Sequence, residues 1–222
     1  RPLRSIFALF NGKKIVFQFG HLESSDEIVI EQDLSSKSKK IKNFKDYNDL
    51  LKNNNIILDH NEREKIILRK INSTSKSKDY KDTLNLKLLE EVVNIVENPN
   101  VLFVSFNKEY LKIPQEIIIS TLEKHQRYFP IFDSRGRLTN NFFVVANKKD
   151  EKKLITIGNK RVVEARLADA KFFWDKDRSK NLIKQIANLK TVTFYEKLGT
   201  IYDKTQRIRK LAAMLSDDLN LN

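Results

Sequence analysis

The chain has 222 residues and a formal net charge of +13, from 42 basic and 29 acidic side chains. This basic excess favours an anionic partner such as nucleic acid, although a biased base composition produces the same total. The sequence contains no cysteine, no apolar run long enough to cross a bilayer and no signal-peptide pattern, which excludes disulfides and predicts a cytoplasmic protein without a membrane segment.

The N-terminal segment predicts a small β-rich region. Residues 4–10 and 15–19 are rich in apolar side chains, as is typical of strands. Asn11-Gly12 between them is a two-residue hairpin signal, because both residues tolerate a positive φ. Residues 28–30 predict a third strand, and the serines and lysines of 35–40 predict a polar loop.

The next segment predicts helices separated by shorter elements. Helical spacing of apolar residues predicts a helix over 44–51, and the apolar residues 56–58 predict a short buried strand. Asp59 is predicted to cap a helix that ends at Ile71. The polar residues 72–83 then predict a surface loop.

A helix and a strand follow this loop. The apolar residues whose helical spacing predicts the helix are Leu84, Leu88, Val92 and Ile95. The continuous apolar run 101–106 predicts a central strand. Together with the hairpins, these elements predict an α+β fold with a mixed or mostly antiparallel sheet for residues 1–158.

The middle of the chain predicts a helix and then a hairpin. Pro114 suits the first turn of the helix, and Pro130 is predicted to end it. The residues predicted to share one face of this helix are Ile118, Leu122, His125 and Phe129. Residues 133–136 are a turn signal between a strand that begins at Ile131 and a returning strand over 142–146.

A second, longer helix is predicted to begin at Asn159, whose side chain can cap it. Its buried face is predicted to contain Val163, Leu167, Ala170 and Trp174. Trp174, with Phe172 and Phe173, is predicted to form the core of a domain junction. No strand is predicted beyond this point, and further apolar stripes predict a helical domain over 159–222.

The sequence His125-Gln126-Arg127-Tyr128 is the most distinctive polar constellation. The histidine and the arginine could hold a phosphate, and the tyrosine could stack on an unpaired base. Alternatively, Tyr128 and Phe129 belong to the core, His125 is a hydrogen-bonded structural residue and Arg127 pairs with an acid. Both interpretations fit the sequence.

The longer helix also carries cations outside its apolar face, and these are Lys160, Arg161, Arg166 and Lys171. They could form a phosphate-facing stripe, or they could be an ordinary solvated helix face. The three histidines, His21, His60 and His125, lie far apart in sequence without a cysteine nearby. Neither a metal site nor a catalytic centre is therefore predicted.

Three segments together resemble a known family. They are residues 123–130 (EKHQRYFP), 161–174 (RVVEARLADAKFFW) and 196–204 (EKLGTIYDK). Their order and spacing are similar to those of the beta subunit of bacterial glycyl-tRNA synthetase, most strongly from about Glu90 to Lys210. Since that beta subunit is longer than this chain, we expect the chain to be an internal fragment.

The resemblance implies a role in attaching glycine to its tRNA with ATP and magnesium. It implies that an alpha subunit holds the activating site, that the beta subunit binds glycine tRNA, and that the two form a heterotetramer. No cofactor is expected in the fragment itself. The implied fold is akin to the editing-type domain of the phenylalanyl-tRNA synthetase beta chain, followed by a helical domain similar to metal-dependent phosphohydrolases, whose metal-binding His–Asp pair is not visible in this sequence.

Two other functions fit part of the pattern. An editing-type hydrolase acting on mischarged tRNA would require a water-activating cluster, which the sequence does not show. A structural scaffold would require only an incidental basic surface. Under the leading hypothesis, tRNA is bound by His125, Arg127, Tyr128, Lys160, Arg161, Arg166 and Lys171.

Overall fold

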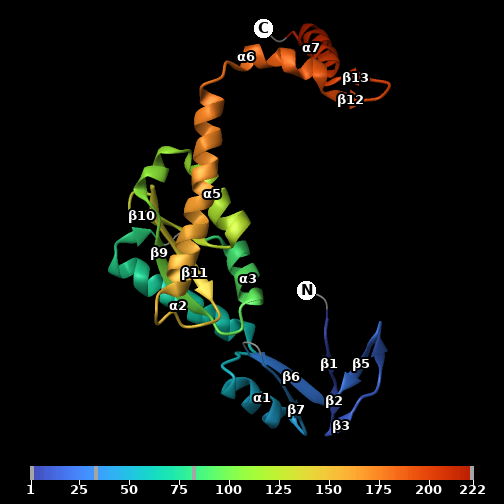
Figure 1. Cartoon of the computed structure of the whole chain (residues 1–222), viewed down its shortest axis with the longest axis vertical. Coiled ribbons are helices and arrows are strands. Elements are labelled where there is room, and N and C mark those ends of the chain that lie inside the picture. Colours follow the sequence, from blue (N-terminus) through green and yellow to red (C-terminus); the bar gives the residue numbers. More distant parts are fainter. Residues whose placement is uncertain (1–2, 33–34, 82–83, 221–222) are drawn as a thin grey trace. The chain divides into compact units, whose positions relative to one another are not determined.

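The computed structural model describes residues 3–32, 35–81 and 84–220 (Figure 1). The fold is α+β, as predicted, with several small sheets. Contacts between Cα atoms divide the chain into two compact units, 1–164 and 165–222. The helix α5 (Leu154–Arg178) runs through this division. The predicted domain ranges, 1–158 and 159–222, stay a prediction.

The main sheet of the first unit has four antiparallel strands in the order β8-β10-β11-β9 (Figure 1). They are β8 (Tyr80–Lys81), β9 (Asn100–Ser105), β10 (Phe129–Asp133) and β11 (Leu138–Ala146). The apolar run 101–106 was predicted to be a central strand, but β9 lies at the edge of the sheet. The long strand β11 takes an inner position beside β10, because it pairs with β10 on one side and β9 on the other.

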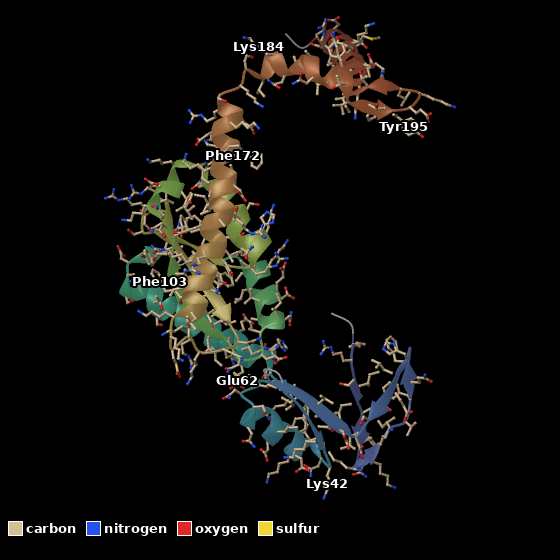
Figure 2. The ribbon with its side chains drawn as sticks, in the orientation of Figure 1. Lys42, Glu62, Phe103, Phe172, Lys184 and Tyr195 are labelled. Atoms are coloured by element: carbon tan, nitrogen blue, oxygen red, sulfur yellow. The ribbon has the colours of Figure 1, made fainter. Side chains whose placement is uncertain are left out.

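One face of this sheet packs against α2 (His60–Ser77) and α3 (Leu86–Ile95). The core between them contains Phe129, Ile131 and Phe143 from the strands, with Phe103 packed beside them (Figure 2). The buried helical residues of this core are Ile67, Ile71, Leu88, Leu89, Val92 and Val93. The predicted helical stripe is thus confirmed at Leu88 and Val92, but Leu84 precedes α3 and Ile95 is exposed.

The opposite face of the sheet is also buried. Because side chains alternate along a strand, Phe142 and Val144 of β11 point away from Phe143. Phe142 is fully buried, and its ring lies 6.2 Å from that of Phe106 and 5.3 Å from that of Tyr128. The four-stranded sheet is therefore enclosed on both faces.

The N-terminal segment forms small sheets from short strands. The predicted Asn11-Gly12 hairpin is confirmed: φ is 49° and 76° at these residues, and β2 (Leu9–Phe10) pairs with β3 (Lys13–Lys14) across them. The predicted partner strand over 15–19 is wrong over most of its length, since only β4 (Gln18–Phe19) is a strand there. The Ser24 hydroxyl donates to the Ile15 carbonyl at 2.6 Å and accepts from the Phe17 amide at 3.0 Å, which replaces regular strand pairing.

A parallel pair joins β1 (Ile6–Phe7) to β5 (Leu22–Ser25), and β5 also pairs with β4, so this sheet is mixed. The predicted third strand is confirmed as β6 (Glu27–Gln32). The predicted polar loop is wrong, because 35–40 is the strand β7 (Ser35–Lys40), antiparallel to β6. A two-stranded ribbon needs backbone partners rather than apolar side chains on both faces, so a polar sequence can form it.

The segment between α1 (Phe44–Asn53) and α3 differs from its prediction in two places. Residues 56–58 are not a strand, because the guanidinium of Arg63 takes the carbonyls of Ile57 (2.6 Å) and Leu58 (2.9 Å). Asp59 caps α2 as predicted, but the helix continues to Ser77. The predicted loop over 72–83 is therefore wrong at 72–77, where hydroxyls bond back to helix carbonyls, and at β8. Residues 82–83 lie outside the described residues.

The second unit contains α6 (Leu182–Gln185), η3 (Ile186–Thr191) and α7 (Ile201–Asp218). It also contains a small hairpin of β12 (Thr193–Tyr195) and β13 (Gly199–Thr200), so the prediction that no strand follows the long helix is wrong. The hairpin leads directly into a capping box, in which Thr200 and Asp203 each accept a hydrogen bond from the other's backbone amide.

A pH-dependent contribution to stability is expected from Asp133, in the turn of the β10–β11 hairpin. Hydrogen bonds from the Arg137 amide, helped by its guanidinium and by the Arg135 amide, outweigh the effect of burial and lower the pKa of Asp133. Since the folded pKa lies below the unfolded value of about 3.9, the contribution is present above that pH and is lost as pH falls through the folded pKa. The difference in Tm between the wild type and Asp133→Asn should therefore shrink on acidification from pH 7 to pH ~2. A difference that stays constant over this range would contradict the assignment.

Opposite effects are expected from two Gly→Ala substitutions. Gly199 has φ +79°, and an added Cβ would lie 2.5 Å from an Asp203 carboxylate oxygen, so Gly199→Ala should destabilise by about 1–2 kcal/mol or more. Gly158 lies within α5 with nothing within 4 Å of an added Cβ, so Gly158→Ala should stabilise by roughly 0.5–1 kcal/mol. Urea unfolding followed by circular dichroism measures both. Equal effects of the two variants would refute the cap geometry.

Candidate nucleic-acid interface

The segment before β10 changes its helical geometry in the middle. Pro114 precedes α4 (Gln115–Ser120), which continues as a π-helical turn, η2 (Thr121–His125). Ile118 and Leu122 are buried as predicted, but His125 is exposed, because the wider π turn rotates later residues away from that face. The helix also ends before Pro130, which lies in β10 instead of ending the helix as predicted.

Arg127 follows this turn in a left-handed conformation, with φ +61°. Its Nε lies 2.6 Å from a carboxylate oxygen of Glu91 in α3, and its Nη1 donates to the backbone carbonyls of Glu123 and Lys124. The guanidinium thus donates to carbonyls at the end of its own helix and forms an ion pair with Glu91, which is distant in sequence. This arrangement agrees with the alternative in which Arg127 pairs with an acid. A contribution of Arg127 to RNA binding stays a prediction.

Tyr128 lies inside the fold, with 8% of its surface exposed. Its ring stacks on Phe142, and its hydroxyl donates a hydrogen bond to the side-chain oxygen of Asn159 in α5. A stacked base would have to displace this packing. The geometry therefore gives Tyr128 a positioning role between the sheet and α5.

The start of α5 differs from the prediction. The helix begins at Leu154, and Asn159 lies inside it, where its amide donates to the Ile155 carbonyl at 2.7 Å. Asp150 performs the capping instead: its carboxylate accepts from the amides of Ile155 (2.9 Å) and Thr156 (2.8 Å). Burial raises the pKa of Asp150, but these bonds and one from the Thr156 hydroxyl outweigh it, so the pKa is lowered. Asn159 was misassigned because its real partner, Tyr128, is distant in sequence.

The buried stripe predicted for α5 is confirmed at Val163 and Leu167, which are fully buried, whereas Ala170 and Trp174 are half-buried. The four predicted cations surround this stripe instead of forming one line. At about 100° per residue, Lys160 and Lys171 fall on one flank of the stripe, Arg166 falls on the other, and Arg161 lies on the opposite side of the helix.

These cations differ in their partners. Lys160 lies 3.9 Å from Glu164, which also accepts a hydrogen bond from the Asn107 amide at 2.9 Å, and Lys171 pairs with Asp175. Arg161 and Arg166 are exposed, and neither guanidinium has an ion pair or hydrogen bond to another residue in the described part of the chain. They are the candidates most available to an external anion.

The predicted junction core at 172–174 is not formed by the two phenylalanines. Phe172 and Phe173 are 61% and 59% exposed, with Phe172 projecting outward from α5 (Figure 2). Trp174 is half-buried. Aromatic character alone suggested a core here, whereas Phe172 lies on the side of α5 opposite the Val163–Leu167 stripe and Phe173 lies on the flank that carries Arg166.

Glu91, which no sequence pattern predicted, is the ion partner of a candidate site residue. It lies on the polar side of α3 and meets Arg127 only through the fold. Within the described residues, no group of three His, Asp or Glu side chains is arranged to hold a metal ion. None of the helices in these residues is long and apolar enough to cross a membrane.

Comparison with known proteins identifies a family over the whole chain. The family model described as "Glycyl-tRNA synthetase beta subunit" matches residues 1–222. Curated relatives named "Glycine--tRNA ligase beta subunit" include those of Clostridioides difficile (strain 630), 39% identical over 100% of this chain, and Aquifex aeolicus (strain VF5), 40% identical over 97% of it. The chain covers 32% of the length of each relative. The resemblance based on the three sequence segments is thus confirmed.

Removal of the Tyr128 hydroxyl tests the contact between the sheet and α5. Tyr128→Phe leaves the Asn159 oxygen without this donor and should cost about 0.5–1.5 kcal/mol of unfolding free energy. In a double-mutant cycle with Asn159→Ala, a coupling of similar size is expected. Tyr195→Phe, on a ring that is 65% exposed, is the matched control and should have little effect. Zero coupling would show that the bond contributes nothing.

Proposed function

We propose, since this chain belongs to the glycyl-tRNA synthetase beta subunit family, that it is the part of a heteromeric glycine–tRNA ligase that binds and positions tRNA. The observation that carries the proposal is the match of the family model to all residues of the chain. In this assignment the substrate is glycine tRNA, and the chain itself performs no chemical step.

The charge of the chain supports binding to a polyanion. Both compact units carry more basic than acidic residues, and the total is +13. Arg161 and Arg166 present guanidinium groups that no acidic side chain in the described residues neutralises. Because a polyphosphate backbone releases counterions when cations bind it, such groups contribute directly to affinity for RNA.

The remaining parts of the proposal come from the family resemblance. An alpha subunit would activate glycine with ATP and magnesium, and alpha and beta subunits would assemble as a heterotetramer in the cytoplasm. The first unit would share its fold with the editing-type domain of the phenylalanyl-tRNA synthetase beta chain. Positioning of tRNA would then depend on residues 154–164 of α5, which belong to the first unit and are held in it through Asn159 and Glu164.

Titration of the chain with glycine tRNA and with an unrelated tRNA, over a salt series, tests this function. Tighter binding of glycine tRNA is expected, with affinity that falls steeply as salt increases. Arg161→Glu and Arg166→Glu should each weaken binding and reduce the slope of log K against log salt by about 1, the effect of losing one phosphate contact.

Lys45→Glu, at an exposed position of α1, is the control for a general change in charge. It should leave the slope nearly unchanged. Equal losses in all three variants would reduce the interaction to general phosphate attraction. An absence of binding at low salt would refute the proposed function and favour a scaffold, while hydrolysis of mischarged tRNA by the chain would establish the editing alternative.

A further inference from the structure

Two contacts connect the π turn before β10 with helix α3. The side-chain amide of Asn85, which caps α3, donates to the carboxylate of Glu123 at 3.0 Å. Farther along α3, Glu91 pairs with Arg127. This cluster joins a π turn to a non-glycine residue with positive φ, two features that are enriched at functional sites.

The Arg127 guanidinium has two groups of partners with different properties. Its Nη1 bonds to the carbonyls of Glu123 and Lys124, which belong to the same turn and hold the group in place. Its Nε pairs with Glu91, whose carboxylate comes from a different helix. The first set of contacts can persist while the second partner is exchanged.

The Arg127–Glu91 pair is accessible to an external anion. The side chains of Arg127 and Glu91 are 43% and 54% exposed, so water screens their attraction and the pair is weak. Lys124 and His125 lie beside Arg127 in the chain and are also exposed. A phosphodiester presents the charge and the oxygen geometry that a guanidinium binds best, so it can compete with a single carboxylate.

We propose that Glu91 occupies a phosphate-binding site in the free protein, and that a phosphate of bound RNA replaces its carboxylate on Arg127. This inference rests on the proposed function, because it names how one site of tRNA contact is regulated. Glu91 acts as an internal competitor: it keeps Arg127 positioned and lowers the affinity of the site for anions. Only a ligand that also binds elsewhere on the chain gains enough to displace it.

The sign of the predicted effect distinguishes this exchange from a structural ion pair. Glu91→Gln removes the competing charge, so glycine tRNA should bind more tightly by roughly twofold to fivefold, the range that corresponds to an exposed ion pair. Glu90→Gln is the matched control, because it removes the same charge from the adjacent exposed position of α3, where the described residues provide no ion partner. It should tighten binding by a smaller factor.

The same two variants in an Arg127→Gln background complete the test. Without the guanidinium, Glu91→Gln and Glu90→Gln should become equivalent in their effect on affinity. If the wild-type protein binds tRNA but Glu91→Gln and Glu90→Gln have equal effects while Arg127 is still present, this inference is overturned and the proposed function stays intact. Weaker binding by Glu91→Gln would likewise overturn it, and would show that the pair serves to position Arg127. Wild-type protein that binds no tRNA would overturn both proposals.

Discussion

The inner position of β11 is the constraint on which the first unit depends. Both edges of this strand are paired, one with β10 and the other with β9. Its adjacent residues Phe142 and Phe143 are buried on opposite faces of the sheet. A strand buried on both faces must be covered by two layers, and α2 and α3 provide one of them. The other layer forms around Phe142. Tyr128 belongs to this layer, because its ring stacks on Phe142 and its hydroxyl bonds to Asn159 of α5.

This arrangement explains why the most distinctive polar segment of the chain has two roles. Its residues alternate between the interior and the surface at the point where the chain leaves the π turn and enters β10. Tyr128 points inward and supports α5, whereas Arg127 is forced outward by its left-handed backbone and meets α3. Mutations of these neighbouring residues should therefore have different effects. A mutation of Tyr128 disturbs the fold, whereas a mutation of Arg127 changes the surface electrostatics.

Local patterns predicted the elements whose determinants are local. The Asn11-Gly12 turn, the Asp59 cap and the buried stripe of α5 depend on residues within a few positions of one another. The errors arose where a side chain outside the predicted element decided the outcome. Arg63 removed the carbonyls that a strand at 56–58 would need, and Tyr128 occupied the side chain that was expected to cap α5.

The same reasoning separates the candidate site residues. Arg127 and Arg161 have identical chemistry, and nothing in their sequence neighbourhoods distinguishes an occupied guanidinium from an available one. The difference comes from Glu91, which only the packing of α3 brings to Arg127, while Arg161 lies on the side of α5 opposite its buried stripe. An anion approaching Arg161 displaces water alone, whereas one approaching Arg127 must displace a carboxylate. The two arginines would therefore contribute unequally to RNA affinity even if each contacted one phosphate.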